Sequence, residues 1–143
     1  MCSLPTDRGI DPGAGGNWAI RYAAENNHLH VVQYLCSLPT NRGVDPSARG
    51  NYAVGHAAEN GHLQVVQYLR SLPANHGVDP SAGYNYAIRN AAENGYLQVV
   101  QYLCSLPTNR GVDPRAYFVH LRYGYSRRHS QVEEFLRSLE IVN

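Results

Sequence analysis

Apolar residues recur with helical spacing in the middle of the chain. Val54, Ala57 and Ala58 fall at positions i, i+3 and i+4, so they share one face of a predicted first helix. A second helix is predicted to begin near Gly61 and to end before Pro73, because proline lacks the N–H that continues a helix. Its wider apolar face consists of Leu63, Val65, Val66, Leu69 and Leu72. This stretch therefore predicts a pair of short helices.

The same pattern returns every 34 residues. Cys-Ser-Leu-Pro occupies residues 2–5, 36–39 and 104–107, and Arg-Ser-Leu-Pro occupies residues 70–73. In the last copy the spacing falls to 33, since residues 131–136 match residues 98–103. A lone helix pair cannot bury both of its faces, so repeated pairs must stack side by side.

The segments between the helix pairs are built from turn residues. Residues 74–84 are rich in Asn, Gly, Asp, Pro and Ser, and we expect an exposed connection or a hairpin-like finger. The pattern as a whole predicts one all-α domain over residues 1–143, a solenoid of stacked helix-turn-helix repeats with finger connections. The expected repeats span residues 6–38, 40–72 and 74–106, and a degenerate capping repeat spans 108–143.

The residues after Asn51 carry a family resemblance. Residues 52–66 read Tyr-Ala-Val-Gly-His-Ala-Ala-Glu-Asn-Gly-His-Leu-Gln-Val-Val, and the stretch recurs in three units with a period of 33 to 34. The pattern resembles the ankyrin repeat over essentially the whole chain. Its Asn-Tyr-Ala-Ile-Arg variant is similar to arrays in amoebae, fungi and giant viruses.

The chain departs from the family pattern in the first helix. The Thr-Pro pair of the family is replaced by an aromatic residue and alanine, beginning at Trp18, Tyr52 and Tyr86. The family histidine is replaced by Arg21, Gly55 and Arg89. The usual hydroxyl and imidazole hydrogen bonds are therefore missing, and we expect asparagine side chains to cap the first helices instead. These are Asn17, Asn51 and Asn85.

The resemblance implies a non-catalytic module that binds a protein or peptide on a concave face. In the family this face is lined by connections and first helices, and positions that vary between units of this chain map there. Aromatic side chains beside forked guanidinium groups can anchor a partner at low entropy cost. The expected binding residues are Trp18, Arg21, Tyr22, Arg49, Tyr52, His56, Tyr84, Tyr86, Arg89, Asn90 and Tyr117. A second interpretation is that the repeated aromatic row packs as core between neighbouring connections.

Composition and charge exclude several other classes. The 143 residues have a formal net charge of +1, and all 12 basic side chains are arginine. This balance argues against a polycation or an acidic tail. No apolar run approaches the roughly 20 residues of a membrane helix, and residues 1–16 lack the apolar core of an export signal. We therefore expect a soluble protein that does not contact membranes.

The three cysteines are expected to be free thiols. Cys2 and Cys36 lie one repeat apart, where stacked helices are about 8–10 Å apart, whereas a disulfide needs Cα atoms roughly 4.4–6.8 Å apart. The same argument separates Cys36 from Cys104. Arg70 at the equivalent position indicates an exterior, tolerant site. Free thiols fit a reducing compartment, so the expected localisation is intracellular, cytoplasmic or nuclear.

No catalytic, cofactor or metal-binding pattern is present, so neither an enzyme nor a cofactor is expected. The acids before proline recur with the unit, which indicates turns in which the carboxylate bonds local backbone N–H groups. They are Asp11, Asp45, Asp79 and Asp113. His28 and His62 share a repeat position that Tyr96 occupies in the third unit, and no metal-ligand spacing accompanies them. A helix-start histidine bonded to a neighbouring turn is favoured over zinc.

The fourth unit offers an alternative site for nucleic acid. A stretch without acids interleaves aromatic residues with four arginines, which are Arg115, Arg122, Arg127 and Arg128. Nucleic acid is nevertheless disfavoured, because the net charge is near zero and terminal repeats need a polar outer face. The last helix provides that face with Glu133, Glu134, Arg137 and Glu140.

The first helix pair lacks a preceding neighbour. Its flank, including Leu29 and Val32, is expected to expose apolar surface. This predicts either that the chain is a fragment of a longer array or that it covers the flank by self-association.

Overall fold

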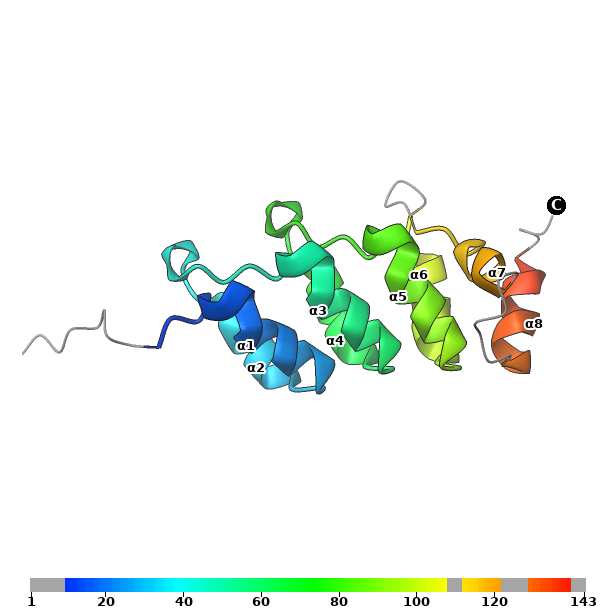
Figure 1. Ribbon diagram of the computed structural model, residues 1–143, viewed down its shortest axis with the longest axis horizontal. Helices are drawn as coiled ribbons and strands as arrows, with labels where there is room; N and C mark the ends of the chain where they lie inside the picture. The colour runs from blue at the N-terminus through cyan, green and yellow to red at the C-terminus, as the bar shows by residue number, and fades with distance from the viewer. Residues whose placement is uncertain (1–9, 108–111, 122–128, 140–143) are drawn as a thin grey trace, which may run out of the picture.

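The computed structural model describes residues 10–107, 112–121 and 129–139 (Figure 1). Within these residues the chain forms eight α-helices and no β-strand. The first three pairs are α1 (Ala14–Glu25) with α2 (Leu29–Ser37), α3 (Ala48–Glu59) with α4 (Leu63–Ser71), and α5 (Ala82–Glu93) with α6 (Leu97–Ser105). The last pair is α7 (Ala116–Leu121) with α8 (Ser130–Ser138).

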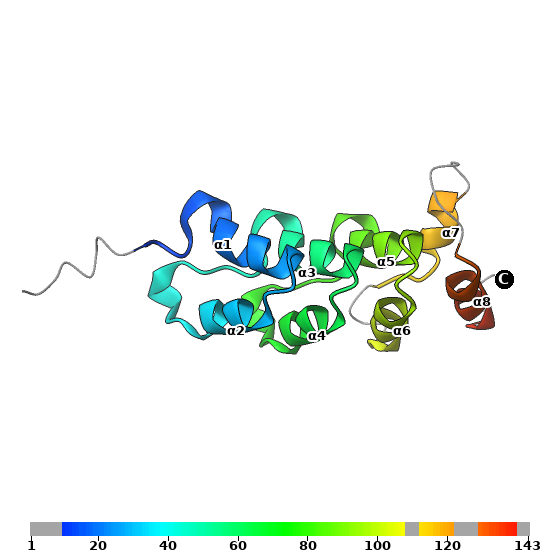
Figure 2. The ribbon, with the colours of Figure 1, turned by 90° about the horizontal axis from the view of Figure 1, so that it is seen from below.

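The helices lie in two rows, so that each pair stacks on the next (Figures 1 and 2). The first helices α1, α3, α5 and α7 form one row, and the second helices α2, α4, α6 and α8 form the other. The first helices pack more closely on each other than the second helices do. This arrangement confirms the predicted all-α solenoid.

The core lies between the rows and follows the repeat. Small residues on the first helices, such as Ala57 and Ala58, are fully buried and permit the close approach of neighbouring helices. On the second helices Val65, Val66 and Leu69 are fully buried. A buried apolar side chain of this size stabilises the fold by roughly 1.5–3 kcal/mol. The predicted apolar faces are therefore the observed ones.

The second helices begin and end where the sequence places them. His62 lies immediately before α4, and α4 ends at Ser71. Leu72 then adopts an extended backbone with ψ 148° because it precedes Pro73. Beyond the proline, the connections contain one turn of 3-10 helix, η2 (Thr40–Arg42) or η3 (Ala74–His76). They are exposed connections without a hairpin ladder.

The first helices begin earlier than predicted, through a left-handed turn. In α3, Arg49, Gly50 and Asn51 have φ values of 57°, 67° and 66°. The Asn51 side chain does not cap its own helix, because its carbonyl oxygen accepts the backbone N–H of Asp79 at 2.8 Å. The prediction that Asn17, Asn51 and Asn85 cap the first helices is therefore wrong. Each asparagine instead links its unit to the next one.

The two ends of the stack differ in polarity. On α8, Glu134 and Arg137 are exposed and Glu133 is half-buried, as expected for a polar cap. Glu140 lies outside the described residues.

At the other end Val32 is fully buried, which contradicts its predicted exposure, and Leu29 is half-buried. The apolar surface of this flank comes from Val31 and Tyr34, which are 47% and 64% exposed. Val65, at the repeat position of Val31, is 0% exposed.

Candidate functional site

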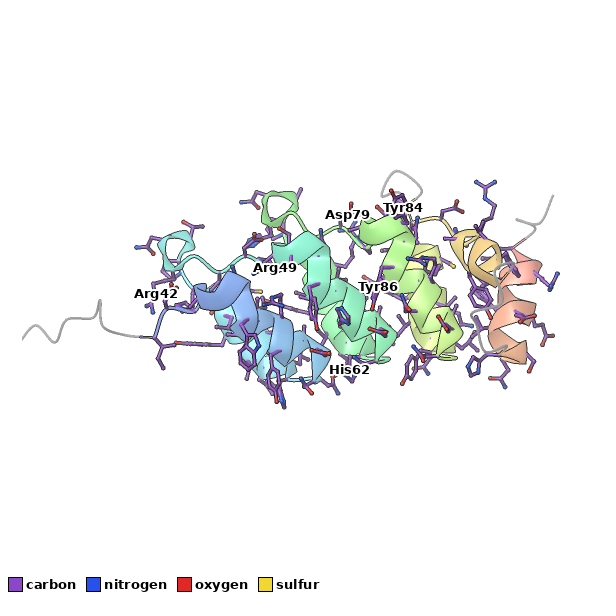
Figure 3. All side chains as sticks on the ribbon, in the orientation of Figure 1. Arg42, Arg49, His62, Asp79, Tyr84 and Tyr86 are labelled. Carbon is purple, nitrogen blue, oxygen red and sulfur yellow. The ribbon has the colours of Figure 1, made fainter. Side chains whose placement is uncertain are left out.

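The candidate site is the surface that α1, α3 and α5 turn away from the second helices, which we call the first-helix face (Figure 3). Three aromatic side chains of α1 and α5 are strongly exposed: Tyr84 at 93%, Trp18 at 57% and Tyr22 at 46%. Trp18 and Tyr22 stack with ring centroids 4.6 Å apart, so each holds the other in place. Their rings present a fixed aromatic surface at the end of α1.

The row of Trp18, Tyr52 and Tyr86 also has a packing role. The Tyr52 hydroxyl donates to Glu25 Oε2 at 3.2 Å, and the Tyr86 hydroxyl donates to Glu59 Oε2 at 2.8 Å. Burial first, and then the hydrogen bond to Glu59, raises the pKa of Tyr86 well above its usual range. Each tyrosine is thereby fixed to the preceding unit, whereas Trp18 has no such bond among the described residues.

His56 joins two of these aromatic rings. Its ring lies 3.7 Å from that of Tyr52 and 5.1 Å from that of Tyr86, measured between centroids. Its Nδ1 lies 2.7 Å from Glu59 Oε2, the same oxygen that the Tyr86 hydroxyl bonds. Tyr52, His56 and Tyr86 are half-buried, so the row packs between first helices while its edges stay accessible.

Two of the predicted binding arginines are engaged within the chain. Arg21 Nε donates to the carbonyl of Gly16 at 2.9 Å, and Arg21 Nη2 donates to that of Gly15 at 3.1 Å. Its guanidinium carbon also lies 5.0 Å from the centre of the Tyr52 ring. Arg89 binds the carbonyls of its own left-handed turn in the same way. These arginines brace the turns that precede the regular part of their helices.

The unit between them lacks this arginine and contains a cavity instead. Gly55 occupies the position, and a cavity of about 140 Å³ opens between α3 and α5. Its lining includes Gly50, Tyr52, Gly55, His56, Asp79 and Tyr86.

Two other predicted contacts differ from expectation. Tyr117 is fully buried in the core, so it is not a surface contact, and its inclusion in the binding set is wrong. The Asn90 side-chain amide donates to the carbonyl of Tyr86 at 2.9 Å, one turn earlier on the same helix. Arg49, in contrast, is exposed and makes no hydrogen bond or ion pair within the described part of the chain.

The alternative arginine patch falls mostly outside the described residues, where Arg122, Arg127 and Arg128 lie. Arg115 is described, and its Nε pairs with Asp113 at 3.2 Å. This pairing leaves Arg115 partly neutralised.

The recurrent acids and histidines have structural roles. Asp79 Oδ1 accepts the backbone N–H of Ser81 at 2.9 Å, and the other three predicted aspartates accept local N–H groups likewise, which confirms the turns. His62 Nε2 lies 2.8 Å from the carbonyl of Glu25, which confirms the predicted inter-unit bond for His62. His28 makes no such bond within the described part of the chain. No group of three or more His, Cys, Asp or Glu side chains that could hold a metal occurs among the described residues.

Cys36 and Cys104 are free thiols, but they are less exterior than predicted. Both are half-buried and pack against the core. Burial raises the pKa of Cys36 to about 11 and that of Cys104 to about 12. These thiols are therefore poor nucleophiles at neutral pH.

Glu25 and Glu59 recur with the unit in the sequence, but their role in joining the units was not predicted. Each is the last residue of a first helix, and its side chain and carbonyl accept bonds from the following unit. Their exact recurrence with the period was the available signal.

The fold and the recurring inter-unit bonds define a helical-repeat protein of the class built from stacked helix pairs. A family model described as ankyrin repeats (3 copies) matches residues 20–117, and the chain belongs to the ankyrin repeat family. Ankyrin repeats generally act as protein-interaction modules and are typically non-catalytic. No curated protein and no solved structure matches the chain. Among the described helices, none combines the length and apolarity needed to cross a membrane.

Proposed function

We propose that the protein binds a partner protein or peptide on the first-helix face and catalyses no reaction. The observation that carries this proposal is the exposure of Trp18, Tyr22 and Tyr84 on the first helices of a braced repeat stack. Exposed large aromatic side chains on a fixed backbone are typical of binding surfaces. Arg49 adds an exposed guanidinium group, and arginine is enriched with aromatics among the residues that dominate binding energy.

The rigidity of the face supports the same function. The backbone N–H groups of Asp45 and Asp79 donate hydrogen bonds to the side-chain oxygens of Asn17 and Asn51, and these bonds hold neighbouring units together. Stacking of Trp18 on Tyr22 restricts both rings before a partner arrives. Binding then loses little conformational entropy, so more of the contact energy contributes to affinity.

Affinity capture from the source lysate tests the proposal. The wild-type protein is compared with a Trp18→Ala, Tyr84→Ala variant and with a Tyr34→Ala variant, in which an exposed aromatic is removed from α2 instead. We expect a protein that the wild type and Tyr34→Ala retain and the double variant loses, with and without nuclease. Circular dichroism confirms that all three are folded. Equal retention by the wild type and the double variant would exclude the first-helix face.

Self-association is a second candidate function, which the flank of α2 favours. Val31 and Tyr34 are exposed there, although their repeat equivalents Val65 and Tyr68 are buried or half-buried against neighbours. Light scattering over a hundredfold concentration range tests this. A mass that rises with concentration in the wild type and stays at 15.9 kDa in Val31→Glu supports it. A constant monomer mass in the wild type excludes it.

We also propose a reducing intracellular compartment, cytoplasmic or nuclear. The support is that Cys36 and Cys104 are free, half-buried thiols. Imaging of the tagged protein in its source cells tests this, and secretion into the medium would contradict it.

A further inference from the structure

The left-handed turns at the starts of α1, α3 and α5 share one backbone geometry. They differ in the side chains that donate hydrogen bonds to their carbonyls. The turn of α1 has φ values of 62°, 65° and 63°, and that of α3 has 57°, 67° and 66°. In α1 and α5, an arginine five residues after the second turn residue donates two N–H groups to two turn carbonyls. In α3, Gly55 stands at that position and supplies no donor.

The corresponding carbonyls of α3 are therefore left without a side-chain partner. They belong to Arg49 and Gly50, and no side chain of the described residues donates to either. The guanidinium of Arg49 does not turn back to them. It lies against α1, where a Cβ placed on Gly16 would be 2.6 Å from Arg49 Nε.

The space that the missing side chain leaves is open and lined by suitable groups. The cavity of about 140 Å³ lies beside Gly55, and its wall includes the Tyr86 ring. In the preceding unit, the equivalent ring of Tyr52 lies 5.0 Å from the guanidinium carbon of Arg21. The volume equals roughly four to five water molecules at about 30 Å³ each, which is enough for a guanidinium group. Asp79 is also among the lining residues.

We propose that this cavity, which we call the Gly55 socket, binds an arginine side chain of the partner. The inference rests on the proposed function and names the chemistry that the first-helix face recognises. The incoming guanidinium takes the place that Arg21 and Arg89 fill in the neighbouring units. It donates to the carbonyls of Arg49 and Gly50 and lies over the ring of Tyr86.

The geometry selects arginine over lysine. Two N–H groups held in one plane match two neighbouring carbonyls, as the bonds of Arg21 at 2.9 and 3.1 Å show. A lysine ammonium is a compact and strongly hydrated charge without this fork. A partner segment with one arginine at the centre of its contact with α3 and α5 is therefore the expected ligand.

A titration of the full chain with N-acetyl-arginine methylamide tests the socket directly. The probe is followed by ¹⁵N–¹H NMR up to millimolar concentration, because a single side chain supplies little affinity alone. We expect saturable shifts of the Gly50, Gly55 and Tyr86 amides, and at least tenfold weaker binding of the matching lysine and citrulline compounds. Absence of saturable shifts, or equal binding of the lysine compound, overturns the proposal.

Two matched variants test the assignment within the same protein, one by filling the Gly55 socket and one by opening an equivalent cavity in the preceding unit. Gly55→Arg supplies the missing side chain, and its Cβ would lie 3.1 Å from Tyr86 Cδ1, a contact that a small movement of the ring relieves. We expect it to abolish the shifts. Arg21→Gly should open an equivalent socket beside Tyr52 and add shifts at Gly16. If Gly55→Arg is folded and still binds the probe at Gly50 and Tyr86, the assignment is wrong.

Partner capture and the probe titration together distinguish failure of this inference from failure of the proposed function. Loss of captured partner in Trp18→Ala, Tyr84→Ala with full retention in Gly55→Arg would leave the first-helix face as the binding surface and overturn the socket. Loss of the same partner in Gly55→Arg, together with arginine-specific shifts in the wild type, supports the socket.

Discussion

The side-chain carbonyl of Asn51 accepts the backbone N–H of Asp79, 28 residues further along the chain, at 2.8 Å. Asn51 reaches this position because its backbone is left-handed, with φ 66°. Asparagine is one of the few residues with a side chain that adopts this conformation readily. The bond joins the start of α3 to the turn before α5, so it fixes the orientation of one unit relative to the next.

Asn51→Ala should lower the free energy of unfolding by about 2 kcal/mol. Loss of the hydrogen bond accounts for about 1 kcal/mol, and a left-handed alanine costs a further 1 kcal/mol or so. Asn51→Gly should cost only about 1 kcal/mol, because glycine tolerates the positive φ. Urea denaturation followed by circular dichroism measures both. Asn75→Ala is the control, since Asn75 is exposed in η3, and an equal loss there would contradict the assigned role.

Tyr86→Phe should destabilise the protein by about 1–2 kcal/mol, because it removes the 2.8 Å bond to the Glu59 carboxylate. Tyr84→Phe is the matched control, since Tyr84 is 93% exposed, and it should change the free energy of unfolding by less than about 0.5 kcal/mol. The same Tyr86→Phe substitution made in a Glu59→Gln background should cost less. An undiminished effect there would show that the bond is not its cause.

Stability should decline as the pH rises above about 9. Burial raises the folded-state pKa of Tyr86 and of Cys36, so the unfolded chain loses these protons at lower pH than the folded chain does. Their contribution is complete below the unfolded-state pKa values, near 9 for cysteine and 10 for tyrosine. Urea midpoints at pH 8 and pH 10.5 measure the decline. Tyr86→Phe should show a smaller decline than the wild type, and an equal decline would exclude Tyr86 as a contributor.

Most of the fold could be predicted from helical periodicity and from the positions of proline. Val65 and Leu69 fall on one helical face, and Pro73 marks the end of α4, so local rules suffice for these elements. The left-handed turn was missed because Asn51 satisfies the local preference for a helix cap equally well. Its true partner, Asp79, belongs to the next unit, and local preference carries no information about it.

The sequence did not determine which of the predicted binding residues are accessible in the folded protein. Tyr84 and Tyr117 were both predicted to be binding residues because both are tyrosines. Tyr84 is 93% exposed, whereas Tyr117 is fully buried. Tyr117 lies 34 residues after Gly83, which has no side chain, so the preceding unit gave no sign that a side chain at this position would face the core. The sequence also does not distinguish Arg21 from Arg49. In the folded protein the guanidinium of Arg21 is hydrogen-bonded to the backbone of its turn, whereas that of Arg49 lies against Gly16.

Cys36 and Cys104 should react slowly with iodoacetamide at pH 8. Their pKa values of about 11 and about 12 leave far less thiolate than an unfolded chain with a cysteine pKa near 9 contains. We expect alkylation of Cys36 to be on the order of 100-fold slower in the folded protein than in urea, from two units of pKa difference. Mass spectrometry of the separate peptides measures each site. Equal rates with and without urea would contradict the burial.

Val65→Ala and Val31→Ala form a matched pair at one repeat position. Val65 is fully buried between units, so its truncation should lower the free energy of unfolding by about 2 kcal/mol through lost burial and a residual cavity. Val31 is 47% exposed, and its truncation should cost less than about 1 kcal/mol in a monomer. Urea denaturation at low protein concentration measures the difference. If Val31→Ala instead costs as much as Val65→Ala, and only at high concentration, the flank of α2 is covered by a second copy and the self-association candidate gains support.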